Sequence, residues 1–158
     1  MLRIVVVSDS HRNFFALQKV LEKHPEADMV IHLGDGEAEF EDIQQLYPHF
    51  RYAWVSGNCD IASSSPSTVL LRLDGKNIYC THGHTLGVKS SLETLKTAAR
   101  VARASVVLYG HTHIPHTEYD GGLYVMNPGS VSLSRGRGPT YGLLDITPGG
   151  IMLSTAEV

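Results

Sequence analysis

The sequence lacks the features that mark a secreted, membrane-spanning or nucleic-acid-binding protein. Its 158 residues include only two cysteines, Cys59 and Cys80, so no disulfide framework is expected and a reducing cytoplasm is the expected location. No apolar run approaches the roughly 18 residues of a membrane-spanning helix. The apolar start at residues 1–7 ends in polar residues without the cleavage pattern of a signal peptide. The net charge of −3 and the absence of a basic cluster argue against tight binding of nucleic acid.

Glycine-rich nucleotide-binding motifs of the Rossmann or P-loop type are also missing, so neither a nicotinamide cofactor nor a nucleotide-triphosphate site is expected. The composition, 42% apolar and 18% charged, is that of an ordinary globular protein. There is no repeat, low-complexity tract or linker, so we expect one domain over residues 1–158. The unusual count is nine histidines, whose positions prove informative.

Apolar runs alternate with helical stripes over the first sixty residues. Mainly apolar segments at 2–7, 29–33 and 52–55 predict buried strands, and the segments 13–23 and 37–47 predict helices between them. Such a β-α-β-α-β order predicts parallel strands joined by helical crossovers.

After residue 60 the pattern changes to hairpins. Strand pairs are predicted at 68–73 with 77–81, at 116–119 with 123–126, and at 141–146 with 151–154, each around a glycine-containing turn. A helix at 89–103 and a buried strand at 105–109 complete the prediction. The whole chain therefore indicates an α/β protein with mixed sheets packed together and helices outside.

The carboxyl ends of five predicted strands carry carboxylate, imidazole or carboxamide groups. The clusters are Asp9-Ser10-His11, Gly34-Asp35, Gly57-Asn58-Cys59-Asp60, His82-Gly83-His84 and Gly110-His111-Thr112-His113. Ligands of open α/β sheets bind beyond the carboxyl ends of the strands, so these groups are placed to converge. Histidine nitrogen mixed with aspartate and asparagine oxygen suits manganese, iron, zinc or nickel. The neighbouring glycines would permit the tight bends that such loops need.

The aspartates and the asparagine taken alone also have ordinary structural explanations, whereas two spaced histidines at the end of an apolar strand, as in 82–84 and 111–113, rarely serve packing. Asp9 would serve as a turn or helix cap, and Gly-Asp is a common turn. Cys59 could be a nucleophile, but nothing in the sequence indicates a lowered thiol pKa. Four other histidines are interpreted as surface or core residues: His24, His32, His49 and His116. Arg135 and Arg137 are interpreted as part of an exposed loop, with phosphate contact as the minor alternative. The joint pattern, and no single member, favours a metal site.

The ordered motifs Asp-x-His, Gly-Asp, Gly-Asn-x-Asp, His-Gly-His and Gly-His-x-His resemble those of the calcineurin-like metallophosphoesterase superfamily. The short length, the segment Gly57-Asn58-Cys59-Asp60 and the later Asn127-Pro128-Gly129-Ser130 are similar to the small YfcE-type phosphodiesterases of bacteria and archaea. The resemblance runs from Asp9 to Ser130. It implies a four-layer α/β/β/α sandwich of two mixed β-sheets flanked by helices, with two divalent metal ions.

The resemblance also implies a role for each motif residue. One metal would be held by Asp9, His11 and His113, the second by Asn58, His82 and His111, and Asp35 would bridge both. Many relatives have, at the position of Cys59, a histidine that assists the leaving group or binds phosphate. Here Asp60 is retained without that partner, which leaves the general acid open, with His84 as a substitute. The expected catalytic residues are Asn58, Asp60 and His84, and the expected substrate contacts are Asn58, Cys59 and His84.

The implied activity is hydrolysis of a small phosphodiester by a hydroxide that bridges two metal ions. Manganese is the expected metal, with iron, nickel or zinc as alternatives. A phosphomonoesterase using the same site is the first alternative. A noncatalytic scaffold similar to the retromer subunit is the second, and the intact histidines weigh against it. A nuclease is disfavoured by the net charge, and the sequence does not decide whether the chain forms homo-oligomers.

Overall fold

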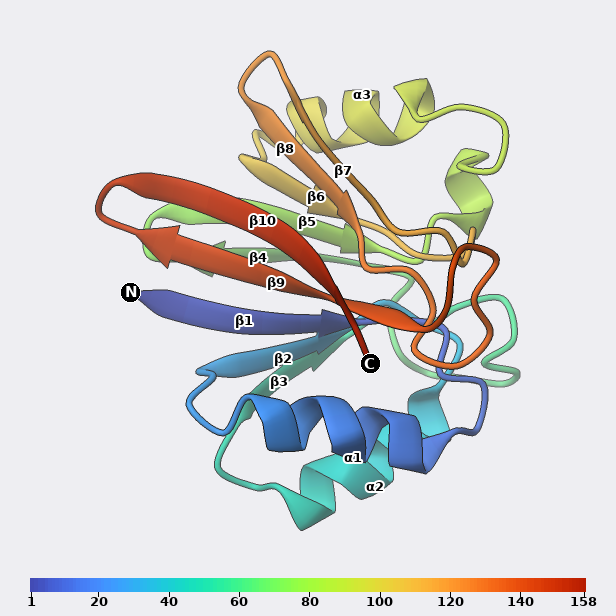
Figure 1. The fold of residues 1–158 in the computed structure, drawn as a ribbon. Helices are drawn as coiled ribbons and strands as arrows, with labels where there is room; N and C mark the ends of the chain where they lie inside the picture. Colours follow the sequence, from blue (N-terminus) through green and yellow to red (C-terminus); the bar gives the residue numbers. More distant parts are fainter.

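Ten strands and three α-helices make up the structure, a computed structural model that describes residues 1–158 (Figure 1). The first five-stranded sheet has the order β10-β9-β1-β2-β3 and contains β1 (Leu2–Val7), β2 (Met29–His32), β3 (Arg51–Trp54), β9 (Thr140–Thr147) and β10 (Gly150–Glu157). The second has the order β4-β5-β6-β8-β7 and contains β4 (Thr68–Leu73), β5 (Lys76–Thr81), β6 (Val106–Leu108), β7 (His116–Asp120) and β8 (Leu123–Asn127). The helices are α1 (Phe14–Lys23), α2 (Glu37–Leu46) and α3 (Glu93–Val101), together with a short 3₁₀ turn, η1 (His84–Leu86).

Strand directions follow the predicted topology. β1, β2 and β3 pair in parallel, with α1 and α2 as the crossovers. β5, β6 and β8 are also parallel neighbours, and the hairpins β4-β5, β7-β8 and β9-β10 are antiparallel. Both sheets are therefore mixed, as the sequence indicated.

Side-chain alternation along β1 explains the layering. Ile4 and Val6 point into the core between the two sheets, where they join Ile78 and Leu108 of the second sheet. The intervening residues of β1 face the opposite way and pack under α1 and α2. The single helix α3 covers the outer face of the second sheet (Figure 1). The result is the expected four-layer α/β/β/α sandwich.

One helix is shorter than its prediction. The segment 89–103 was expected to be helical throughout, but α3 begins only at Glu93. Serine competes for backbone hydrogen bonds outside the helix, and Ser91 Oγ accepts the amide of Glu93 at 3.1 Å. The residues before it instead form turns and η1, bounded by Gly83 and Gly87 in the left-handed region.

The loops that follow the parallel strands meet at one edge of the sandwich. β1 and β5, which belong to different sheets, point to the same side of the molecule (Figure 1). Backbone hydrogen bonds join the loops to one another, with the amide of Asp9 donating to Gly34 at 2.9 Å and that of Gly110 donating to His82 at 3.0 Å. None of the helices has the length and apolar character that a membrane span requires.

Candidate metal centre

Six of the seven predicted metal ligands form two groups in which the ligand atoms lie within 4.8 Å of one another. The first group contains Asp9, His11 and His113, and the second contains Asp35, His82 and His111. The seventh predicted ligand, Asn58, places its Oδ1 3.0 Å from Nε2 of His82. The loops after β1, β2, β3, β5 and β6 each supply at least one of these side chains.

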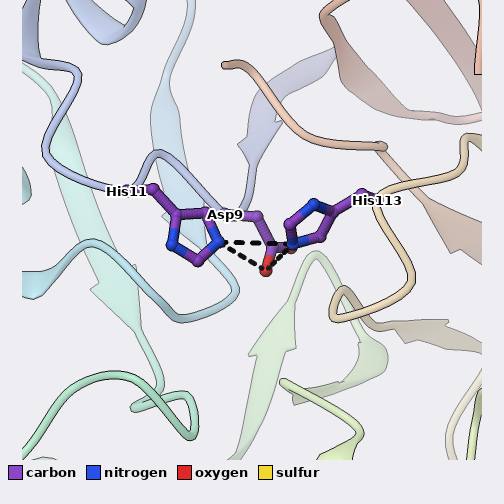
Figure 2. Close-up of side chains that lie close together, drawn as sticks. All are labelled: Asp9, His11 and His113. Atoms are coloured by element: carbon purple, nitrogen blue, oxygen red, sulfur yellow. Dashed lines mark hydrogen bonds and ion pairs between the residues drawn. The ribbon is translucent and has the colours of Figure 1, made fainter. Parts of the chain in front are cut away.

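The first group surrounds a carboxylate oxygen of Asp9 (Figure 2). Asp9 Oδ1 lies 3.2 Å from Nε2 of His113 and 3.7 Å from Nε2 of His11, and these two nitrogens are 3.3 Å apart. The other oxygen, Oδ2, accepts from Ser8 Oγ and from the amide of His111. Asp9 is therefore anchored through one oxygen and presents the other to the cluster.

The second group is centred on Nε2 of His82. This nitrogen lies 3.3 Å from Oδ2 of Asp35 and 3.2 Å from Nδ1 of His111. Oδ2 of Asp35 is in turn 3.8 Å from Nε2 of His11, and His82 Nε2 is 3.8 Å from Oδ1 of Asp9. Asp35 thus lies between the two groups.

The outer ring nitrogens orient two of the histidines. Nδ1 of His82 lies 2.7 Å from the carbonyl oxygen of Leu33, and Nδ1 of His113 lies 2.7 Å from that of Leu133. Each Nδ1 must carry the proton that it donates to its carbonyl, so in the neutral ring Nε2 keeps a lone pair directed into the cluster. This is the usual arrangement of a metal-ligating histidine.

The residues present fit a divalent cation. Asp9 Oδ1 is completely buried and accepts no hydrogen bond, which is costly unless another partner satisfies it. The lone pairs of several imidazole nitrogens face the same space, and a cation would satisfy them together with the carboxylates. Mixed nitrogen and oxygen donors of this kind bind transition-metal ions.

The protonation states of Asp9 and His111 agree with ligation. Burial raises the pKa of Asp9, but its contacts with His11 and His113 outweigh burial and hold the pKa well below its usual range. Burial and the neighbouring His82 lower the pKa of His111 to about 4. At neutral pH Asp9 is therefore a carboxylate and His111 a neutral imidazole, the forms that bind metals.

The ligand backbones are strained. Five of the predicted ligands have φ in the left-handed region, where residues other than glycine are uncommon: Asp9 at 54°, His11 at 43°, Asp35 at 60°, His111 at 70° and His113 at 61°. Such outliers cost about 1–3 kcal/mol each and cluster at functional sites, where the surrounding structure holds them in place.

Comparison with known proteins agrees with this geometry. Residues 2–149 match the model of the calcineurin-like phosphoesterase superfamily domain. The chain belongs to this superfamily. It is 37% identical to the probable metallophosphoesterase YsnB of Bacillus subtilis over 137 residues, 86% of this chain and 79% of that protein.

Two further proteins share this fold. The phosphodiesterase YfcE of Escherichia coli is 30% identical over 172 aligned positions, 92% of this chain and 88% of that protein, and its structure superposes with a TM-score of 0.71 over 91% of this chain and 88% of that chain. Vps29 of Entamoeba histolytica superposes with a TM-score of 0.75 over 99% of each chain at 20% identity, which is a likeness of fold alone. The expected phosphoric ester hydrolase is confirmed at the level of the family, and so is the divalent-metal requirement that the family implies.

Asp60 lies beside the candidate metal centre, and its carboxylate accepts hydrogen bonds from backbone amides. Its two oxygens accept from the amides of Asp35, Gly36, Glu37 and Gly57 at 2.8–3.1 Å. These contacts join the loop after β3 to the loop after β2 and to the first turn of α2. Both carboxylate oxygens of Asp60 therefore accept backbone amides, and its expected catalytic role stays a prediction.

Cys59 and His84 lie at the edge of the cluster. Sγ of the exposed Cys59 is within 4.8 Å of the ligand atoms of His11 and Asp35, and its amide donates to Asp35 Oδ1 at 2.7 Å. Partial desolvation and the charge of Asp35 raise the pKa of the Cys59 thiol, so the thiol is protonated at neutral pH. The ring centroid of His84 is 5.3 Å from that of His82, and burial, followed by the neighbouring His82, lowers the pKa of His84.

A buried polar network behind the ligand loops was not predicted from the sequence. Ser10 Oγ donates to Glu39 Oε2 at 2.9 Å and lies 2.9 Å from Nε2 of His32. Glu39 also accepts the amide of Arg12. His32 was interpreted only as a surface or core residue. The one available indication was a polar pair, His32 and Glu39, bracketing the Gly34-Asp35 motif.

A cavity of about 590 Å³ opens beside the metal centre. The ligands His11 and Asp35 line it together with Cys59 and Arg12, and the first turns of α2 and residues 60–64 complete the wall. A small organic ester has room there next to the ligands.

Proposed function

We propose that this chain is a divalent-metal-dependent phosphodiesterase that hydrolyses small phosphate esters. The observation that carries the proposal is the buried, orphaned Oδ1 of Asp9, which lies 3.2 Å from Nε2 of His113 and 3.7 Å from Nε2 of His11, a residue that lines the neighbouring cavity. The proposed ligands are Asp9, His11 and His113 for one ion, Asn58, His82 and His111 for the other, and Asp35 for both. Two divalent ions, manganese first and iron, nickel or zinc as alternatives, would supply a hydroxide nucleophile between them and offset the charge of the phosphoryl group.

The chain's own residues orient the ester and stabilise its charge. Asn58 is exposed at the centre, and its side-chain amide can donate to a non-bridging phosphoryl oxygen. We propose that His84, as a neutral ring, contacts the substrate on the same side of the centre as Asn58. Cys59 would form the part of the cavity wall that the leaving group contacts. Asp60 positions Asp35 through the amides described above. The free, exposed Cys59 is consistent with the reducing cytoplasm that we propose as the compartment.

Leaving-group preference tests this assignment. The Cys59 thiol is a weak hydrogen-bond donor, and the lowered pKa of His84 leaves that ring unprotonated at neutral pH. Protonation of the leaving group is therefore weak, and aryl phosphodiesters are expected to react much faster than matched alkyl diesters. Equal kcat/KM values for the two would contradict the assignment.

The defining experiment combines metal analysis with paired substrates. Protein stripped with a chelator and reloaded with Mn²⁺ is assayed on an aryl phosphodiester and on the matching aryl monoester. His113→Asn is expected to lose bound manganese and activity, whereas His116→Asn, which alters an exposed ring, keeps both. A faster monoester reaction would favour the phosphomonoesterase alternative. Full metal loading without hydrolysis of either ester would favour the noncatalytic scaffold.

A further inference from the structure

Arg12 has an unusual backbone conformation next to the metal centre. It directly follows the ligand His11 and lines the same cavity as His11 and Asp35. Its φ is 68°, a value that glycine adopts freely and arginine only at a cost. The chain therefore carries a long cationic side chain at a position where glycine would be free of strain.

The buried network of Ser10, His32 and Glu39 fixes the backbone conformation of Arg12. The Arg12 amide donates to the carboxylate of Glu39, whose side chain is buried within the fold. Glu39 is held in turn by Ser10 Oγ at 2.9 Å. The backbone of Arg12 is thus anchored while its side chain remains exposed at the cavity.

The guanidinium of Arg12 has no partner, although most of the charged residues around it are acidic. The carboxylate of Glu37 accepts from Ser65 Oγ, that of Glu39 from Ser10 and the Arg12 amide, and that of Asp60 from backbone amides. Glu41 also lines the cavity, and it forms no ion pair with Arg12. Arg12 is the one cationic side chain on the cavity wall.

We propose that Arg12 is a substrate-binding residue whose guanidinium donates to non-bridging oxygens of the phosphoryl group at the metal centre. The inference rests on the proposed function, because it takes the metal centre to be the place where the ester binds. The planar fork of arginine matches phosphate oxygens in a bidentate way, which lysine cannot do. A dianionic phosphate gains more from this contact than a monoanionic diester, so Arg12 favours inorganic phosphate and monoesters relative to diesters.

The test measures binding of inorganic phosphate to manganese-loaded protein by calorimetry, alongside kcat/KM for an aryl monoester and an aryl diester. Arg12→Gln is expected to weaken phosphate binding about 10- to 100-fold. It should also raise the ratio of diester to monoester kcat/KM. Arg12→Lys should lose less affinity because it keeps the charge.

Two further variants separate binding from folding. Arg12→Gly relieves the left-handed strain, so it should be at least as stable as the wild type and still lose the same phosphate affinity as Arg12→Gln. Arg51→Gln removes an equal charge from the exposed start of β3 and should leave binding and kinetics unchanged. Manganese content should be the same in all of these proteins.

The outcomes distinguish this inference from the proposed function. Wild-type phosphate affinity in Arg12→Gln, with ester hydrolysis intact, overturns the role of Arg12 and leaves the phosphodiesterase standing. Phosphate binding that depends on Arg12, in a protein that hydrolyses no ester, supports the role of Arg12 and removes the proposed function. Absence of phosphate binding by the manganese-loaded wild type overturns the inference.

Discussion

His32 should make the folding stability depend on pH in a way that one substitution can isolate. It ends β2, and its ring is buried beneath the ligand loops. The amide of Gly34 donates to Nδ1 at 3.0 Å, so in the neutral ring the proton is on Nε2 and is donated to Ser10 Oγ at 2.9 Å. Burial lowers the pKa of His32 to about 4.

The sign of the effect follows from proton binding in the two states. An unfolded histidine titrates near a pKa of about 6.5, so between about 4 and 6.5 the unfolded chain binds a proton that the folded chain excludes. Stability rises with pH wherever the unfolded state binds more protons, and the contribution of His32 is therefore lost as the pH falls through this window. Between pH 7 and pH 5 the loss is about 2 kcal/mol.

The assay is urea unfolding of the metal-free protein at pH 5 and pH 7, with wild type and His32→Asn compared at each pH. The asparagine oxygen can still accept the Gly34 amide but does not titrate. The variant is expected to be less stable than the wild type at pH 7 and to lose about 2 kcal/mol less on acidification. His49→Asn, a change to an exposed ring stacked on Phe50, is the matched control and should keep the wild-type pH difference. If His32→Asn and wild type lose equal stability between the two pH values, the reasoning about His32 is refuted.

Three other perturbations test the metal centre and its supports. A Cβ on Gly57 would lie 2.1 Å from Asp35 Oδ1, so Gly57→Ala should displace the Asp35 carboxylate. We expect the free energy of unfolding, measured by chemical denaturation, to fall by about 1–3 kcal/mol and the manganese content to fall with it. In the control Gly149→Ala the nearest atom is 3.6 Å from the new Cβ, so neither quantity should change. Asp60→Asn removes the charge that receives several amides and should lower stability by about 1–3 kcal/mol, whereas an unchanged melting temperature would contradict its positioning role. Because ligating histidines must be neutral, the manganese content retained after dialysis should fall as the pH drops below about 6.5. Equal manganese content at pH 5 and pH 8 would contradict this prediction.

Strands and crossovers were predictable where one periodicity dominated. The strand β1 was predicted with its observed bounds, because both of its faces are covered and Arg3 is its one charged residue. The start of α3 was not, because apolar spacing continues through the preceding turns while Ser90 and Ser91 favour local hydrogen bonds. The spacing of apolar residues indicates which face of a helix is buried, but it does not indicate the residue at which the helix begins.

The convergence of the ligands was predictable from the strand order, since parallel strands deliver their ends to one edge. The network behind them was not, because its members come from separate elements and each is ordinary alone. Ser10 and His32 are 22 residues apart, and Ser10 and Glu39 are 29 apart. Ser10, His32 and Glu39 come together only because α2 packs against the loop after β1, and together they support the loops that carry the predicted ligands.

The roles of the glycines show most clearly what the sequence could not supply. Glycine beside nearly every motif was expected to provide the bends, and Gly34 and Gly83 do have φ of 103°. Gly57 and Gly110 serve a different purpose, because a Cβ on either would lie 2.1 Å from a neighbouring polar atom. At four positions the predicted ligand itself adopts the left-handed conformation without a left-handed glycine beside it: Asp9, His11, His111 and His113. The glycines thus let the loops approach one another closely, and the resulting contacts hold the ligands in strained conformations that aim their donor atoms at a common centre. A bound cation would reinforce those conformations, since it binds the ligand atoms only when they are directed together.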